Sequence, residues 1–313
     1  MEERLFVSSS PHIRDENTIQ KVMSDVIIAL LPATLGALYY FRVNAAKIIF
    51  LSVLTAVISE AVFQRIRKQP ITINDSSAVV TGLLLAFNMP ASVPWWIPVL
   101  GAIIAIVVVK QFFGGVGHNF MNPALAARIM LMISYTGHMT SWVKPGVDAV
   151  STATPLSFVK GLAEVPGRAP KLFDMLMGNT GGCLGETSAI LLILGGIYLI
   201  YRGVISIQVP AIYIATVAVI TLIFGRFDVY FMVYHLLAGG LMLGAIFMAT
   251  DYASAPVTPK GRVIFAFGCG VLTSIFRLYG GYPEGVGFSI LLMNIAAPLI
   301  EKYTSPRVFG EVK

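Results

Sequence analysis

Residues 148–155 read Asp148-Ala149-Val150-Ser151-Thr152-Ala153-Thr154-Pro155. They lie in the longest polar segment of the chain, residues 135–186, and hydrophobic runs come before and after that segment. Small and hydroxyl side chains around one aspartate neither form a hydrophobic core nor enter a bilayer at low cost. The stretch therefore predicts an exposed loop that divides a hydrophobic chain into two parts, and loops of this kind often carry functional residues.

The composition around this loop is that of a membrane protein. Of the 313 residues, 56% are hydrophobic and 12% are charged, and the mean hydropathy is +0.79. Soluble domains carry about 25% charged residues. The first twenty residues are polar, so we expect no removable signal peptide. The two cysteines, Cys183 and Cys269, form neither a CxxC nor a CxxCH pattern, which leaves an iron–sulfur cluster or a c-type haem without support.

The basic residues favour a membrane orientation over a nucleic-acid partner. The net charge is +6, but the lysines and arginines sit in short loops between apolar runs. With the N-terminus inside, fourteen of them, including Lys110 and Arg128, fall at inner ends, and four, including Arg277, fall in short outer loops. The positive-inside rule then predicts cytoplasmic termini and an extracytoplasmic loop at residues 135–186.

Ten hydrophobic segments are candidates for membrane-spanning helices. They are residues 22–41, 46–63, 77–89, 94–111, 122–134, 187–201, 207–224, 229–249, 262–279 and 286–301. The segments 77–89 and 122–134 are short and are expected to be half-helices or strongly tilted. Pro123 marks the start of the second, because proline favours the first turn of a helix.

The two parts of the chain share a weak internal repeat. Residues 82–86 (GLLLA) resemble residues 240–244 (GLMLG), and residues 113–115 (FGG) resemble residues 279–281 (YGG). Five spans in each part would turn the second part upside down relative to the first. Chance similarity between glycine- and leucine-rich helices is the alternative.

We therefore expect an all-α polytopic membrane protein with about ten transmembrane helices in two inverted repeats. The first five-helix repeat covers residues 1–134, and the extracytoplasmic loop covers residues 135–186. The second five-helix repeat, with a cytoplasmic C-terminal tail, covers residues 187–313.

Residues 114–124 (GGVGHNFMNPA) form the first candidate site, with Gly115, His118, Asn119 and Asn122 as its binding residues. Glycines allow a close approach of the backbone to a ligand, and the helix start that follows offers free N–H groups. The polar side chains can hydrogen-bond a flavin ring, a quinone-like head group or a hydrated cation. A tight turn with an asparagine cap is the competing interpretation.

Thr154 is the candidate in the outer loop. No histidine or lysine lies beside it in sequence to activate its hydroxyl, so we do not expect it to be a nucleophile of this protein's own making. A hydroxyl that accepts a phosphate ester from another enzyme needs only exposure and small neighbours, here Ser151, Thr152 and Ala153. A plain Ser/Thr-rich loop is the alternative.

Residues 178–188 (GNTGGCLGETS) lead into the sixth hydrophobic segment. Gly181, Gly182 and Gly185 precede a predicted helix N-terminus, where an anionic phosphate is favoured. Glu186 would be stabilised there too, so a helix-capping role for it is the competing interpretation.

The remaining polar residues of the hydrophobic segments favour structural roles. Asp25, Glu60 and Asp251 lie near predicted membrane boundaries, where snorkelling or loop roles are favoured over ion coordination. His235 is expected to be a hydrogen-bonded helix-packing residue, and the histidines show no metal-ligand spacing. We expect no metal site.

Together these motifs resemble those of the D subunits of Rnf complexes, the membrane-bound ferredoxin:NAD+ oxidoreductases. That family is similar to the B subunits of Na+-translocating NADH:quinone oxidoreductases (Nqr). The resemblance covers nearly the whole chain and rests on the segment count and three runs: GGxGHNxxNPA, Asp-x-x-Ser/Thr-x-Ala-Thr and GxxGGxxGExS. It implies a urea-transporter-like fold.

The resemblance also implies cofactors. In the family pattern FMN is joined through its phosphate to a threonine, and the matching positions are Asp148, Ser151, Ala153 and Thr154, with Thr154 as the esterified residue. Thr152 departs from the pattern, where a glycine is common. A second, noncovalent flavin such as riboflavin is implied near residues 114–122.

The implied function is electron relay between ferredoxin and NAD+ with coupled Na+ or H+ translocation, in a subunit that is not catalytic alone. The implied partners are the other Rnf subunits (A, B, C, E and especially the flavin-carrying G), a flavin transferase and the lipid bilayer, with no nucleic acid. The implied location is a bacterial or archaeal cytoplasmic (inner) membrane. A B-type Nqr subunit, a non-redox channel or transporter of the same fold, and a purely structural membrane subunit are the alternatives.

Overall fold

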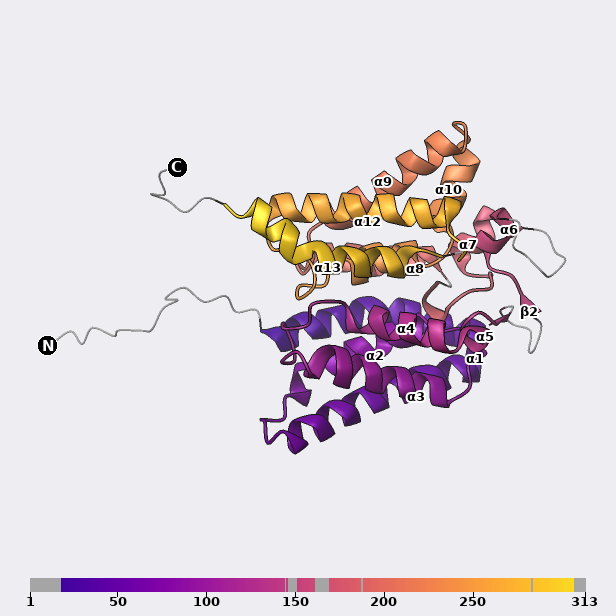
Figure 1. The fold of residues 1–313 in the computed structure, drawn as a ribbon. Coiled ribbons are helices and arrows are strands. Elements are labelled where there is room, and N and C mark those ends of the chain that lie inside the picture. Colours follow the sequence, from indigo (N-terminus) through magenta and orange to yellow (C-terminus); the bar gives the residue numbers. More distant parts are fainter. Residues whose placement is uncertain are drawn as a thin grey trace, which may run out of the picture.

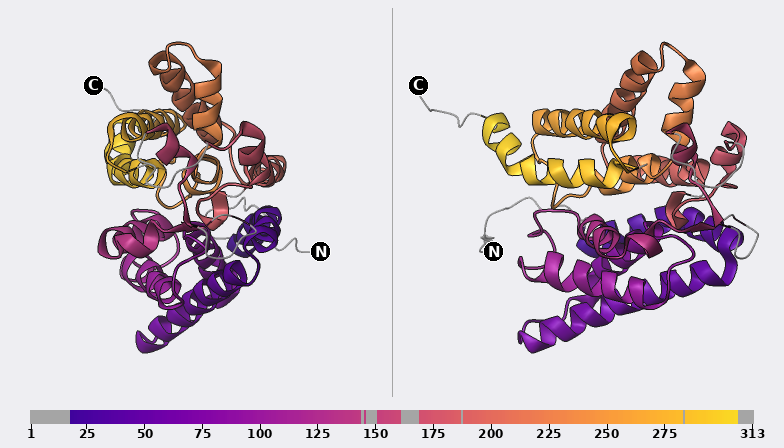
Figure 2. Two further views of the ribbon diagram at one scale, coloured as in Figure 1. Left: turned by 90° about the vertical axis from the view of Figure 1, so that its right-hand side faces the viewer. Right: turned by 45° about the vertical axis from the view of Figure 1, so that its right-hand side comes forward.

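The computed structural model describes residues 18–143, 145, 151–160, 169–186, 188–282 and 284–306. Its helices form two groups that lie side by side, one from the first part of the chain and one from the second (Figures 1 and 2). The start of the first helix and the end of the last lie at the same end of the molecule, which we call the terminal end (Figure 1). The polar connection between the groups lies at the opposite end, which we call the loop end.

The first group contains one long element and several short ones. They are α1 (Ile19–Ile66), η1 (Ile73–Asp75), α2 (Ser77–Phe87), α3 (Trp96–Ile103), the π-helix η2 (Ile104–Gln111), α4 (Pro123–Ser134) and α5 (Thr136–Met139). The expected segments 22–41 and 46–63 are the two arms of α1, which breaks at Arg42, where φ is 48°. At about 1.5 Å per residue, the 11 residues of α2 reach roughly halfway across a bilayer core.

The connection at the loop end contains short elements. They are β1 (Trp142–Val143), β2 (Ser151–Thr152), α6 (Pro155–Val159), α7 (Leu172–Met177) and η3 (Leu184–Glu186). The strands β1 and β2 pair antiparallel, with Val143 opposite Ser151. An isolated bridge between Pro90 and Cys183 joins the end of this connection to the segment that follows α2.

The second group contains the remaining helices. They are α8 (Ala189–Tyr201), α9 (Gln208–Phe224), α10 (Val229–Leu237), α11 (Leu241–Leu243), the π-helix η4 (Gly244–Met248), α12 (Pro259–Tyr279) and α13 (Val286–Thr304). The prediction of one straight span over residues 229–249 was wrong, because α10 and α11–η4 are bent by 65° at the break between them. Gly239 permits the bend, since its φ of +68° lies in a region that side chains disfavour.

Three helices begin with the same local signal. Asn122, Thr154 and Thr258 each accept a hydrogen bond from the backbone N–H three residues ahead, and each is followed by proline at the first helical position. The side chain satisfies one free N–H, and proline lacks the N–H that would be free. These starts are therefore encoded by two adjacent residues.

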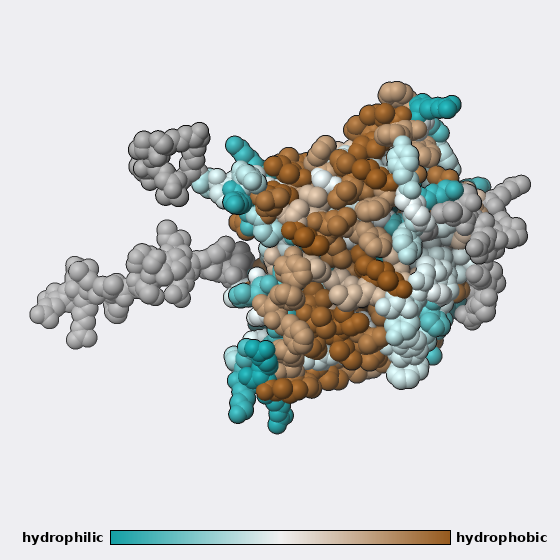
Figure 3. All heavy atoms as spheres, viewed as in Figure 1, coloured by the Kyte–Doolittle hydropathy of each residue, from teal (hydrophilic) through white to brown (hydrophobic). Residues whose placement is uncertain are grey.

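The surface supports a multi-pass membrane protein. Hydrophobic side chains form a band across the middle of the molecule, and hydrophilic ones gather toward its two ends (Figure 3). Within the described residues, three helices are long and apolar enough to cross a membrane, or four with the bent pair, and five shorter helices are apolar. The short ones fit a fold in which spans are interrupted by non-helical segments buried in protein.

Several charged residues predicted at membrane boundaries are buried instead. Glu60, expected to snorkel, is fully buried and pairs with Lys110 at 2.9 Å. Arg128 and Arg277 are also buried in ion pairs. Removing Lys110, Arg128 and Arg277 from the count leaves twelve inner and three outer basic residues, so the orientation that the sequence predicts is unchanged. Asp25 lies at the inner boundary, where it accepts hydrogen bonds from Tyr198 and Arg202.

Gly82 allows α2 to lie directly against the second arm of α1. A Cβ on Gly82 would come within 2.8 Å of the Val53 Cα and 3.2 Å of the Ala56 Cβ. We therefore expect Gly82→Ala to destabilise the protein by about 1–3 kcal/mol through overpacking, seen as a lower thermal unfolding midpoint in detergent. Gly137→Ala is the matched control, since nothing lies within 4 Å of its added Cβ; equal midpoints for the two variants would contradict the prediction.

Candidate functional site

Thr154 is the N-cap of α6 at the loop end, and only 7% of its surface is exposed. Its Oγ1 accepts from Ser157 N at 3.3 Å and lies 2.8 Å from Ser157 Oγ. These are its side-chain hydrogen bonds among the described residues, and none of them involves a histidine, lysine or carboxylate. The hydroxyl is therefore held in place without a general base, as the sequence predicts.

The second group of helices holds α6 from one side. Leu156 packs against Met175, Tyr234 and Ala238 in a small hydrophobic cluster separate from the main core. The Tyr234 hydroxyl donates to Pro155 O at 3.3 Å. The Thr154 segment is thus packed against α7 and α10 rather than extended into solvent.

Lys160 holds the other end of α6. Its ammonium donates to three backbone carbonyls at the end of α12, those of Phe276 (2.8 Å), Gly280 (2.8 Å) and Tyr282 (2.7 Å). Carbonyls at the end of a helix lack partners within that helix, so Lys160 supplies them. Partial burial, and next the nearby positive charge of Arg277, lower the pKa of Lys160 from its usual value.

The glycines of residues 178–188 fit against the Thr154 segment and the core. Gly181 lies directly against Thr152, so closely that a Cβ on it would overlap the threonine methyl group. Gly185 packs on Phe87 and Leu243, with a Cβ position 2.6 Å from the Phe87 Cβ. The structure thus brings Gly181 beside Thr152 and Ala153. Asp148 lies outside the described residues, and Ser151 is described by its backbone alone.

Glu186 does not cap α8. Ser188 occupies the N-cap position and accepts from Leu191 N. The Glu186 carboxyl instead accepts from Cys183 N at 3.2 Å and lies 3.9 Å from the Arg128 guanidinium. The capping interpretation was therefore wrong, because the side chain points toward an arginine that is distant in sequence.

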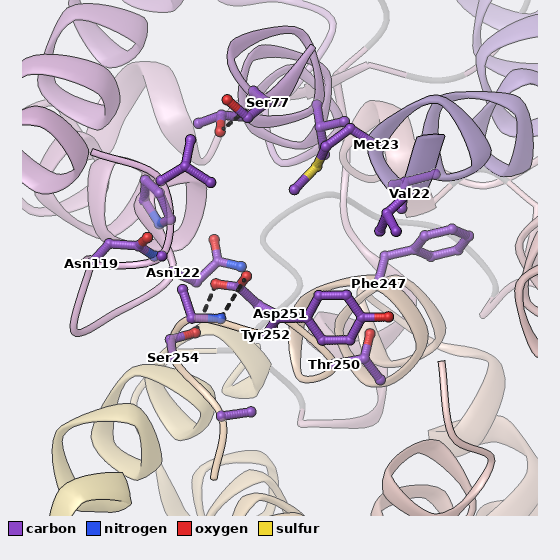
Figure 4. Close-up of a pocket in the computed structure, with 18 of the residues that line it drawn as sticks. Val22, Met23, Ser77, Asn119, Asn122, Phe247, Thr250, Asp251, Tyr252 and Ser254 are labelled. Atoms are coloured by element: carbon purple, nitrogen blue, oxygen red, sulfur yellow. Dashed lines mark hydrogen bonds between the residues drawn. The ribbon is translucent and has the colours of Figure 1, made fainter. Parts of the chain in front are cut away.

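A cavity of about 610 Å³ lies toward the terminal end, between the two groups of helices. Of the four residues predicted around residues 114–124, Asn119 and Asn122 line it. Gly115 and His118 are not among its lining residues, and His118 lies exposed beside Val116 O. Figure 4 shows the two asparagines and Asp251 on one side of the cavity and Val22 and Phe247 on the other.

Asp251 is a cavity residue that the sequence assigned to a turn. Its carboxyl accepts from Ser254 Oγ at 2.8 Å and from Ala253 N at 3.4 Å, so the predicted loop role is correct. Burial raises the pKa of Asp251, and hydrogen bonds from Ser254, Ala253 and Asn119 partly oppose that rise. A partly satisfied carboxyl in a cavity can also contact a ligand.

Both halves of the chain contribute to this cavity. Asn122 Nδ2 donates to Met248 O at 3.5 Å. Asn294, with its amide nitrogen toward Ser254 O, accepts from Asn122 N at 3.0 Å. Lys110 also lines the cavity and donates to Ser77 Oγ at 2.7 Å. The weak internal repeat could have pointed to Asn294, since it matches Asn122 in the second half.

The molecule is thus a multi-pass helical membrane protein with two candidate sites: a buried hydroxyl segment at the loop end and a polar-lined cavity toward the terminal end. The chain belongs to the NQR2, RnfD, RnfE family, whose family model matches residues 6–310. The resemblance inferred from the motifs is therefore confirmed at the level of the family.

Three relatives, each the D subunit of a membrane complex, cover nearly all of the chain. It is 53% identical to that of the Na(+)-translocating ferredoxin:NAD(+) oxidoreductase complex of Acetobacterium woodii, over 99% of this chain and 96% of the relative. It is 46% identical to that of the proton-translocating ferredoxin:NAD(+) oxidoreductase complex of Clostridium ljungdahlii, over 97% and 96%. It is 37% identical to that of the ion-translocating oxidoreductase complex of Halorhodospira halophila, over 97% and 95%.

The Lys160 contacts predict a local stability effect. Lys160→Met removes three hydrogen bonds from an ammonium group, and we expect roughly tenfold faster amide hydrogen exchange in α6 and in residues 280–282. The measurement is hydrogen exchange followed by mass spectrometry. Lys171→Met, at an exposed lysine for which the structure gives no side-chain bond, is the control and should leave exchange unchanged; unchanged exchange in Lys160→Met would remove Lys160 from its anchoring role.

Proposed function

We propose that this chain is the D subunit of an ion-translocating ferredoxin:NAD+ oxidoreductase complex and carries FMN as a phosphoester on Thr154. The observation that carries the proposal is the fixed Thr154 hydroxyl at the loop end, in a chain whose relatives of 53% and 46% identity are subunits of such complexes. One of these relatives is named for Na+ and the other for protons, so the ion moved by this chain is either Na+ or H+.

The residues around Thr154 fit a phosphoester. The Ser157 N–H and hydroxyl that now meet Thr154 Oγ1 can donate to phosphate oxygens, which are strong acceptors. Ala153 and Gly181 add little side-chain volume beside the threonine. Because α6 lies at the outer edge of the loop end (Figure 1), a bulky group joined there can project away from the helices.

The flavin, when bound, supplies one- and two-electron redox chemistry. The protein's own residues position it. Tyr234 and Lys160 fix the two ends of α6, so the Thr154 oxygen keeps its place relative to α10 and α12. Gly181 allows residues 180–182 to pack over Thr152 and exclude water from the backbone beneath it.

The cavity supports a second, noncovalent flavin such as riboflavin. Its volume of about 610 Å³ falls within the range of roughly 300–1,000 Å³ typical of small-molecule pockets. Asn119, Asn122 and Asp251 supply hydrogen-bonding groups to ring or ribityl atoms. Phe247 and Tyr252 supply aromatic faces and edges against which a flat ring can pack.

The remaining finer assignments follow from the same family membership. The first repeat would cover residues 1–134, the loop 135–186 and the inverted second repeat 187–313, with an ion route near the axis between the repeats. The termini would be cytoplasmic and Thr154 extracytoplasmic, in a bacterial or archaeal cytoplasmic membrane. The partners would be the A, B, C, E and G proteins of the complex, with G exchanging electrons with this flavin, and a flavin transferase for maturation.

Denaturing electrophoresis tests the covalent flavin directly. When the chain is co-expressed with its flavin transferase, we expect in-gel fluorescence at its mass, absent in Thr154→Ala. Thr140→Ala is the matched control, because Thr140 is an exposed threonine whose hydroxyl bonds only a helix carbonyl. A dark wild-type band would reject the redox hypothesis in favour of a channel, a transporter or a structural subunit. Oxidation of NADH with quinone reduction, in place of ferredoxin-dependent NAD+ reduction, would favour the B-type Nqr subunit.

The second flavin is tested in the Thr154→Ala background, where covalent flavin cannot contribute. We expect denaturation of the purified complex to release additional flavin when Asn119 is intact. Asn119→Leu removes a hydrogen-bonding group and should weaken flavin retention by roughly 2- to 10-fold, measured as flavin released per chain after dialysis. His118→Leu, beside the cavity but not lining it, should retain flavin; equal loss in both variants would count against binding in this cavity.

A further inference from the structure

Four charged side chains meet between the two groups of helices, on the side of the loop end. Arg128 Nη2 of α4 lies 3.9 Å from Glu186 Oε1 and 3.9 Å from Glu284 Oε2. Arg277 Nη2 of α12 lies 3.3 Å from Glu284 Oε1. The side chains are 0–18% exposed, so the two carboxyls and two guanidiniums are removed from bulk water together.

The carboxyl of Glu284 is fully supplied with donors, whereas that of Glu186 is not. Glu284 Oε1 accepts from Gly240 N at 2.8 Å and from Arg277. Glu186 Oε2 accepts from Cys183 N, but its Oε1 is buried without a hydrogen-bond partner among the described residues. Oε1 and the Glu284 carboxyl both border Gly240, at 3.5 and 3.6 Å from its Cβ position.

One proton resolves this arrangement. Two carboxylates can only accept hydrogen bonds, so neither can satisfy the other when both are ionised. A proton on Glu186 Oε1 turns that atom into a donor to the Glu284 carboxylate. Burial, followed by the negative charge of Glu284, raises the pKa of Glu186 well above its usual value. Burial alone would also raise the pKa of Glu284, but its bond to Glu186 and its contacts with Arg277 and Arg128 lower it on balance.

We propose that Glu186 and Glu284 form a proton-binding site that takes up one proton when negative charge reaches the group esterified to Thr154, and releases it when that charge leaves. The response to charge rests on the proposed flavin, whereas the shared proton does not.

The neighbouring groups favour a proton over a metal ion. Arg128 and Arg277 flank the pair from both sides, and two guanidiniums would repel a bound Na+ or divalent cation. The other titratable groups around the pair are Cys183, His235 of α10 and Lys160. His235 and Lys160 lie beside Arg277, and the Cys183 thiol lies 3.6 Å from Arg128. None of them adds a negative oxygen that a metal would need.

A short path joins the pair to the Thr154 segment. The Cβ position of Gly182 lies 2.7 Å from Glu186 Oε2, and that of its neighbour Gly181 lies 3.6 Å from Ala153 O. One layer of backbone therefore separates the Glu186 carboxyl from the segment that carries Thr154. A negative charge added near that segment lowers the free energy of the protonated pair relative to the ionised one.

The step balances without a further reactant. The electron comes from the reduced ferredoxin that the proposed complex oxidises, and water at the loop end supplies the proton. An O–H bond forms on Glu186, and the hydrogen bond to Glu284 forms with it. When the electron moves on to the next carrier, the O–H bond breaks and the proton returns to water.

Infrared difference spectroscopy of the intact complex tests the shared proton. Spectra recorded between neutral and alkaline pH, in H2O and D2O, should contain a protonated-carboxyl band that is lost in Glu186→Gln. The band should also be lost in Glu284→Gln, because without the neighbouring negative charge Arg128 favours ionised Glu186. Asp174→Asn, at an α7 carboxyl remote from the pair, is the control and should keep the band. A band that survives in both Gln variants, or a wild-type complex without one, overturns the proposal.

The second arm uses Thr154→Ala and the redox state. The band should persist in oxidised Thr154→Ala, since the pair needs no flavin. In the wild type, reduction should shift its half-loss to higher pH, and Thr154→Ala should abolish that shift. If the chain proves to carry no covalent flavin, the proposed function fails while the band remains as evidence for the pair. If covalent flavin is present and reduction causes no shift, the coupling proposed here is wrong.

Discussion

The arrangement of the two helix groups depends on the ion-pair network of Arg128, Glu186, Glu284 and Arg277. Its members come from α4, from η3, from α12 and from the turn before α13, so it ties both groups to the connecting loop. Buried charges are costly unless they are paired, and removing one partner of such a pair costs about 3–5 kcal/mol. The network therefore constrains which packing of these helices is acceptable, because any other packing leaves a charge without its partner.

The same constraint explains why the loop end is part of the scaffold. Glu284 and the carbonyls bound by Lys160 belong to one turn, residues 280–285, between α12 and α13. Arg277 donates to the His235 and Ala238 carbonyls at the end of α10, next to the bend at Gly239. The segment that carries Thr154 is thus fixed to the same turn that completes the buried network. A site that must hold a cofactor at a constant distance from other redox centres benefits from that rigidity.

The features that the sequence predicted well are local ones. Hydrophobic runs predicted the positions of the helices, and two-residue signals such as Asn122-Pro123 predicted their starts. The break at Gly239 was missed because the run 229–249 is hydrophobic throughout, and hydropathy does not report the direction of the chain. The burial of Glu60 was missed for another reason: its partners Lys110 and Gln111 are about fifty positions away, on the π-helix η2. The cavity residues Asp251 and Asn294 likewise join Asn122 only after the two halves pack.

The capped threonine–proline start occurs twice in this chain, at Thr154-Pro155 and at Thr258-Pro259. The two threonines have the same φ of −69°, and each hydroxyl meets a second hydroxyl, that of Ser157 at 2.8 Å and that of Thr304 at 2.7 Å. An enzyme that read only this local geometry would find two equivalent acceptors. They lie at opposite ends of the molecule, α6 at the loop end and the start of α12 at the terminal end (Figure 1). A modifying enzyme confined to one side of the membrane would therefore meet only one of them, so that the topology of the chain itself contributes to the choice of acceptor.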